Sequence, residues 1–252
     1  AQASGRGGGR TGGWGAARGP SRRCLWYLRG GGGGGGGQAV LIEDDAVVRY
    51  SFPGDDTNDV YIGGALNLGT SWIHQSFGDT GWASGPLGIG YTADDPDPYD
   101  AYIQTDVQES MLGGAIGIYM RSSFTLASAT EVNGLTLRIR HDDGFVAYLN
   151  GNPVPVASAN APTDPTALAY DSVGENHPDA DAVAVKEFVF SASDYALTSG
   201  VNVLAVHGLN QATTSNDALW KWELVGELAS MGLSGNRNYF TRPSPGVTNG
   251  EG

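Results

Sequence analysis

The stretch "RIRHDDGFVAYLNG", residues 138–151, joins two strand patterns through turn residues. Apolar residues alternate with other residues before Asp142 and again after Gly144, as they do in β-strands with one buried face. These residues are Leu135, Leu137 and Ile139 in the first strand and Phe145, Ala147 and Leu149 in the second. Because Asp and Gly favour turn geometry, residues 142–144 are predicted to close a β-hairpin. The "NG" at 150–151 predicts a second tight turn.

Four further segments combine period-two patterning with β-branched and aromatic residues. They are "AVVRYSF" (46–52), "VKEFVFS" (185–191), "NVLAVHGL" (202–209) and "LWKWELV" (219–225). Loops rich in Gly, Pro, Asn and Asp separate them, and only "QTDVQESML" (104–112) suggests a helical turn. Many short strands in one unit predict an all-β fold, an antiparallel β-sandwich or jelly roll. Within it, Leu204 is expected in the core, and His207, on the alternate face of the same strand, is expected to be packed or hydrogen-bonded and not a ligand.

Composition divides the chain into three parts. Residues 1–38 are so rich in glycine and arginine that they predict a disordered low-complexity leader. Residues 39–228 carry the strand patterns and are expected to form the β-sandwich module. Residues 229–252 contain "RPSPG" and predict a C-terminal linker.

Charge is distributed unevenly along the chain. Residues 1–38 contain six arginines and no acid, so the remainder carries 8 basic and 27 acidic residues, a net charge of −19. Such a body repels phosphate groups, which excludes nucleic acid and membrane lipid as partners of the folded part. The single cysteine, Cys24, leaves the body without a disulfide. Its apolar runs are all shorter than the roughly 18 residues needed to span a bilayer.

Several ordered blocks resemble a galactose-binding-domain-like jelly roll. They are "WIHQSFGDTGWASGPLGIGY" (72–91), "DDGFVAYLNG" (142–151), "GVNVLAVHGLN" (200–210) and "TSNDALWKWELVG" (214–226). The resemblance implies a module of a large secreted bacterial surface protein or polysaccharide-processing protein, with an extracellular or cell-surface location. It also implies neighbouring domains in the same polypeptide. The two tryptophans of "LWKWEL" depart from the pattern, since such modules more often have smaller apolar residues there.

Sequence motifs of catalysis are absent. The chain has no G-x-S-x-G, H-E-x-x-H or P-loop, and its four histidines show no metal-ligand spacing. His141 precedes Asp142 and Asp143, but adjacent strand residues point to opposite faces, so the three side chains need not converge. We therefore expect no enzymatic activity.

The acid pair also suggests calcium. The paired acids of "DDG" resemble the Asp-Asp turn of protective-antigen-type sandwich lectins, in which calcium bridges protein and sugar, and this likeness makes Asp142 and Asp143 candidate calcium ligands. Simple solvated turns are the competing interpretation. Of the two acids, we expect Asp143, next to Gly144, to fix the turn. Asp142 is expected to remain available to a ligand or a cation.

Aromatic residues offer a second kind of binding surface. In "LWKWELV" Trp220 and Trp222 alternate with charged residues, which predicts that both are buried. Tyr91, Tyr99 and Tyr170 lie in predicted loops and are the expected exposed ligand-binding residues. Exposed aromatic faces flanked by a few polar groups suit sugars.

Two functions from different classes remain open. The first is a non-catalytic carbohydrate-recognition or accessory module of a larger exported protein, with a polysaccharide or glycan as partner. The second is a structural spacer or display domain without a ligand of its own. A spacer is expected to bury Trp72, Trp82, Trp220 and Trp222. A hydrolase, the third interpretation, requires two or more carboxylates converging in one cleft.

Overall fold

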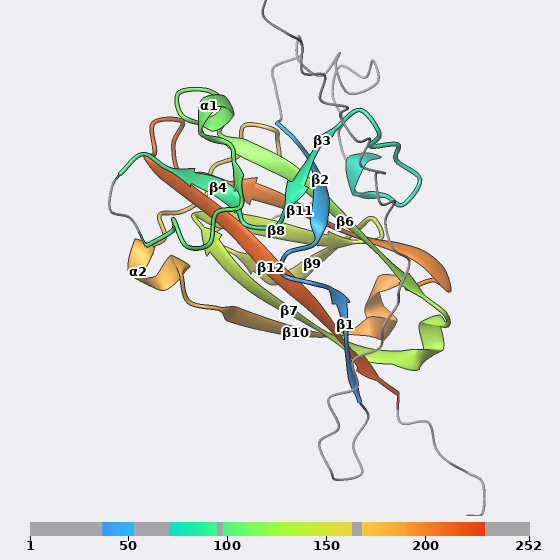
Figure 1. The fold of residues 1–252 in the computed structure, drawn as a ribbon. Coiled ribbons are helices and arrows are strands. Elements are labelled where there is room, and N and C mark those ends of the chain that lie inside the picture. The colour runs from blue at the N-terminus through green and yellow to red at the C-terminus, as the bar shows by residue number, and fades with distance from the viewer. Residues whose placement is uncertain (1–36, 53–70, 95–97, 163–167, 230–252) are drawn as a thin grey trace, which may run out of the picture.

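Alternating apolar side chains build the facing surfaces of two β-sheets (Figure 1). The computed structural model describes residues 37–52, 71–94, 98–162 and 168–229. In these residues each sheet has six strands, and every strand pair is antiparallel except the short parallel pair β4–β5. The expected antiparallel β-sandwich is therefore confirmed.

The first sheet has the order β10-β7-β12-β4-β5, with β1 also paired to β12. Its strands are β1 (Gln38–Ile42), β4 (Ile89–Thr92), β5 (Thr105–Asp106), β7 (Val132–Asp142), β10 (Lys186–Ser191) and β12 (Asp217–Leu228). β1 and β4 pair with opposite ends of β12, the long strand that crosses the sheet in Figure 1.

The second sheet has the order β3-β2-β6-β11-β8-β9. Its strands are β2 (Val47–Ser51), β3 (Ala83–Pro86), β6 (Gly117–Leu126), β8 (Gly144–Leu149), β9 (Asn152–Ala159) and β11 (Gly200–Leu209). β11 lies between β6 and β8 and is apolar on both faces, as expected for a central strand.

Helical structure in the described ranges is limited to short segments. They are α1 (Gln108–Met111), α2 (Asp179–Ala182) and the 3-10 segments η2 (Ser71–Ile73), η3 (Ala129–Glu131) and η4 (Ala192–Tyr195). In this part of the chain, no helix has the length and hydropathy needed to cross a membrane.

The core lies between the two sheets. Trp220 and Trp222 are 0% and 1% exposed, so their predicted burial is confirmed. Leu204 is fully buried in the same core, and His207, on the other face of β11, is 1% exposed. Burying these large side chains supplies the main favourable term in folding.

The predicted hairpin at residues 142–144 is wrong. β7 pairs with β10 and β12, whereas β8 pairs with β9 and β11, so Asp143 carries the chain from one sheet to the other. The Asp142–Asp143 peptide bond is cis. At Gly144 a Cβ atom would lie 2.3 Å from the Asn160 carbonyl oxygen, so this position needs glycine because another backbone comes close. Asp and Gly occur both in corners between sheets and in hairpin turns, so the sequence pattern suggested a hairpin here.

The tight turn predicted at "NG" is confirmed. β8 and β9 pair directly, with Leu149 opposite Asn152, and both Asn150 and Gly151 have positive φ. These angles are those of a two-residue hairpin turn, which Asn-Gly favours.

The predicted domain ends fall at the limits of the described residues. β1 begins at Gln38, which pairs with Glu227, and β12 ends at Leu228. Of the predicted leader (1–38) and linker (229–252), residues 1–36 and 230–252 lie outside the described residues, and Gln38 already belongs to β1.

Candidate functional site

The sheet-to-sheet corner brings Asp143 to the centre of a backbone hydrogen-bond network. Its Oδ1 accepts the backbone N–H of His177 at 3.0 Å, and its Oδ2 accepts that of Gln211 at 2.7 Å. Both donors are distant in the sequence. Asp143 therefore accepts backbone N–H groups, as expected, but it joins three segments of chain instead of fixing a local turn.

The neighbouring carboxyl of Asp142 lies in a different environment. It is 1% exposed, so Asp142 does not lie at the surface, where the expected ligand or cation would reach it from solvent. Its Oδ1 has no hydrogen-bond partner in the described part of the chain, while the side chain interacts with the Tyr99 hydroxyl. Burial raises the pKa of Asp142 to about 9, with further contributions from the Asp143 and Asp217 carboxylates. The geometry therefore favours a protonated, uncharged Asp142 at neutral pH.

A histidine pair lies on the other side of the corner. The rings of His141 and His177 stack with centroids 4.5 Å apart. The Lys186 ammonium lies 2.6 Å from His177 Nε2, and since an ammonium group only donates, this ring nitrogen is the acceptor. His177 Nδ1 donates to the His141 carbonyl oxygen at 2.8 Å. Burial lowers the pKa of His141 to about 3, so the His141 ring is neutral at neutral pH.

The expected tyrosine surface is present only in part. Tyr91 and Tyr99 are 1% and 0% exposed, so the prediction that they are exposed is wrong, whereas Tyr170 is 40% exposed. The Tyr91 hydroxyl donates to the Ser215 carbonyl oxygen at 2.8 Å and accepts from the Asn210 amide. Burial is the main cause that raises the pKa of Tyr91 to about 12. Loop sequence suggested exposure, but these rings fill space beside the buried acids.

The acid pair does not form a ready-made metal centre. Among the described residues there is no group of three or more His, Cys, Asp or Glu side chains that could hold a metal ion. Calcium prefers six to eight oxygen ligands, and both Asp143 oxygens already accept N–H groups. Asp142 is the acid of the pair that keeps an unpartnered oxygen. Calcium binding at Asp142 and Asp143 thus stays a prediction.

Residues 71–82, which we name the cap segment, cover the outer face of the second sheet. Trp72 stacks on Tyr119 with ring centroids 4.3 Å apart, and His207 packs edge-on against the same tyrosine. Trp72 and Trp82 are 3% and 4% exposed. All four tryptophans that distinguish a spacer from an aromatic binding surface are therefore buried.

Arg121 of β6 holds the cap segment in place. This guanidinium, 4% exposed, pairs with Asp79 through an Nε–Oδ2 distance of 2.8 Å. Its remaining donors bond the carbonyl oxygens of Trp72, His74 and Phe77. Sequence reasoning missed this role. The available signal was a charged residue within the apolar strand "IYMRSSF", a position that demands a partner.

A cleft lies between the cap segment and strands β2, β6 and β11. Its volume is about 300 Å3, and we name it the cap cleft. It is lined by Val47, Arg49, Gln75, Phe77, Asp79, Arg121, Ser122, Ser123, Val201 and Val203. The lining combines charged, amide and hydroxyl groups with one aromatic ring.

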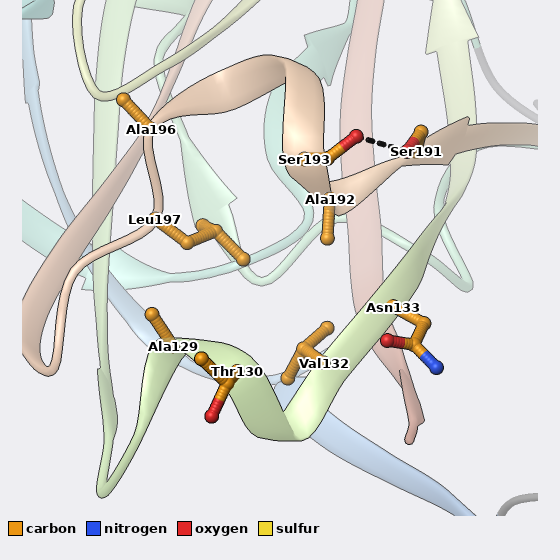
Figure 2. Close-up of a pocket in the computed structure, with 9 residues that line it drawn as sticks. All are labelled: Ala129, Thr130, Val132, Asn133, Ser191, Ala192, Ser193, Ala196 and Leu197. Atoms are coloured by element: carbon orange, nitrogen blue, oxygen red, sulfur yellow. Dashed lines mark hydrogen bonds between the residues drawn. The ribbon is translucent and has the colours of Figure 1, made fainter. Parts of the chain in front are cut away.

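A second hollow, of about 560 Å3, lies between η3 and η4 (Figure 2). The side chains of Val132, Ala192 and Leu197 point into it, and the hydroxyls of Ser191 and Ser193 are 2.9 Å apart. The side chains lining it are small or aliphatic, and none is charged or aromatic. It therefore offers fewer groups that could orient a ligand than the cap cleft does.

Comparisons with known proteins found only remote structural similarity. Neither a protein-family model nor a curated protein matches it. Solved structures that resemble part of it include β-glucuronidases. A Bacteroides uniformis enzyme has a TM-score of 0.41 and 13% identity over 75% of this chain and 18% of its own. One from Ruminococcus gnavus has a TM-score of 0.38 and 12% identity over 75% and 28%. An uncultured Clostridium sp. enzyme has a TM-score of 0.39 and 13% identity over 81% and 31%. The chain spans less than a third of these proteins, and likeness this remote assigns neither a family nor an activity.

Proposed function

We propose that the chain is a non-catalytic carbohydrate-recognition or accessory module of a larger exported protein. The observation that carries the non-catalytic part is the burial of the acid–histidine cluster. His141, Asp142 and Asp143 are each 1% exposed. A general acid or base must reach the proton that it transfers. These groups lie close to Tyr99 and the segment around His177, and their burial supports a role other than proton transfer to a substrate.

Carbohydrate as the partner rests on two supports. The sequence blocks resemble galactose-binding-domain-like modules, and the β-sandwich is the expected architecture. The surface also provides a polar cleft with a volume at the small end of ligand pockets. An extracellular location fits the acidic, lysine-poor body, in which Lys186 and Lys221 are the only lysines.

A structural spacer is the second candidate, and one observation favours it. Trp72, Trp82, Trp220 and Trp222 are all at most 4% exposed, as a spacer requires. A carbohydrate module of this chain would therefore use planar polar side chains more than tryptophan platforms.

Affinity electrophoresis of the full chain distinguishes the two candidates. The protein is run through gels that contain soluble polysaccharides, once with calcium and once with a chelator. Retardation by at least one polysaccharide is the expected result. Unchanged mobility in every gel, under both conditions, would overturn carbohydrate recognition and leave the spacer.

A further inference from the structure

The cap cleft has walls that are fixed by hydrogen bonds on both sides. On one side Arg121 bonds the cap segment through Asp79 and three carbonyl oxygens. On the other side the Gln75 amide donates to the Val201 carbonyl oxygen at 2.8 Å and to the Thr198 hydroxyl at 3.3 Å. The cleft is thus shaped before any ligand arrives, which lowers the entropy cost of binding.

Several polar groups in the cleft have bonding capacity left. Arg49 donates one N–H to the Trp82 carbonyl oxygen at 3.3 Å and pairs with no carboxylate in the described ranges. The Ser123 hydroxyl is exposed, and the Gln75 carbonyl oxygen and the second Asp79 oxygen are acceptors. A sugar hydroxyl both donates and accepts, so it can bond to groups of both kinds.

Apolar residues complete the lining. Val47 and Val201 are 71% and 57% exposed, among the most exposed large apolar side chains in the described residues, and both line this cleft with Phe77. Apolar side chains beside a few placed polar groups are the usual composition of a ligand site. The C–H face of a sugar ring matches such a patch, while its hydroxyl edge matches the polar groups.

Charge indicates which sugars fit. Arg121 pairs with Asp79, whereas Arg49 has no carboxylate partner among the described residues. The whole chain has a net charge of −13, which repels polyanions. The hydroxyls of an uncharged sugar can still accept hydrogen bonds from Arg49 without meeting that repulsion.

We propose that the cap cleft binds a sugar unit of a neutral polysaccharide. This inference rests on the proposed function and adds a site and a ligand class to it. Arg49, Gln75 and Asp79 bond the ring hydroxyls, and Phe77 with Val201 contacts the apolar face of the ring. Arg121 acts as a positioning residue that holds the cap segment.

A matched pair of variants on one strand tests the site. Ser123 and Thr125 are both exposed and lie on the same outward face of β6, but only Ser123 lines the cleft. Ser123→Trp should fill the cleft and weaken binding at least about tenfold, or 1.4 kcal/mol. Thr125→Trp should bind as the unmodified chain does. Val47→Trp, on the neighbouring strand β2, is a second blocking variant in case the first does not fold.

The probes are a soluble galactan, a xylan and a β-glucan, with polygalacturonate as the charged comparison. Loss of binding in the blocking variants, with Thr125→Trp unchanged, supports the cleft. Full binding by both folded blocking variants overturns the cleft but leaves carbohydrate recognition standing. Binding of polygalacturonate alone overturns the neutral ligand class. Binding of no polysaccharide overturns the proposed function itself.

Discussion

The Asp143 carboxylate accepts the backbone N–H of Gln211 at 2.7 Å, although the two residues are 68 positions apart. The same carboxylate accepts the His177 N–H from a third segment. One side chain therefore accepts backbone donors from two distant segments. The Gln211 N–H also reaches the Asn210 side-chain oxygen at 2.8 Å.

Replacement of Asp143 should destabilise the fold. Asp143→Ala leaves the buried His177 N–H without its acceptor, which costs about 1–3 kcal/mol, whereas the Gln211 N–H keeps the Asn210 side-chain oxygen. Asp143→Asn keeps one acceptor oxygen and should lose less. Urea denaturation at neutral pH measures the difference. Equal stability of Asp143→Ala and the unmodified protein would contradict the structural role.

Asp142 should make stability fall as the pH rises. Its pKa is about 9 in the folded state and close to 4 when unfolded, so the folded chain holds a proton that the unfolded chain releases. The stabilising contribution is complete below about pH 4 and is lost progressively toward pH 9. Asp142→Asn, which stays neutral, should gain stability relative to the unmodified chain as the pH rises from 5 to 9. The exposed Asp100→Asn is the control, and a gain that does not change with pH would refute the expectation.

Calcium should act through Asp142 if the predicted site exists. A cation that binds only the folded chain raises Tm by mass action. Calcium should therefore raise the Tm of the unmodified protein and leave Asp142→Asn unchanged. Magnesium, which requires a tighter octahedral site, serves as the control. The absence of any calcium-dependent shift in differential scanning fluorimetry would rule the site out.

Loss of Arg121 should release the cap segment. Arg121→Met leaves Asp79 and three carbonyl oxygens without their donor, and breaking such a buried pair costs on the order of 3 kcal/mol. Trp72 and Trp82 should then become solvent-exposed, which shifts tryptophan fluorescence to longer wavelength. Arg138→Met is the matched control, because Arg138 forms surface ion pairs worth about 1 kcal/mol or less. Indistinguishable emission from the two variants would contradict the anchoring role.

Shortening a core side chain on the central strand β11 should lower the free energy of unfolding. Leu204 is fully buried, and Leu204→Ala should cost about 2–5 kcal/mol because it leaves a cavity. Val189→Ala, on an edge strand and at a side chain 64% exposed, should change stability by only about 0.5 kcal/mol. Denaturation midpoints of both variants provide the comparison.

The local sequence pattern was sufficient to predict five strands and the burial of two core tryptophans. Period-two alternation reflects which face of a strand meets the core, so it located β7, β8, β10, β11 and β12 and the burial of Trp220 and Trp222. The tight turn at Asn150 and Gly151 followed from the positive φ angles that these residues tolerate.

Tertiary contacts decided the rest. Whether Asp142 and Asp143 close a hairpin or a sheet-to-sheet corner depends on which strands pair, and strand pairing joins residues far apart in the chain. The burial of Tyr91 and Tyr99 depends on the neighbours that enclose them. The surrounding Gly, Pro and Asp residues suggested solvated loops, but Tyr91 lies in strand β4 and both rings are buried. The anchoring of the cap segment likewise could not be predicted from local sequence. Arg121 and Asp79 are 42 positions apart, and only the folded chain brings the guanidinium and the carboxylate together.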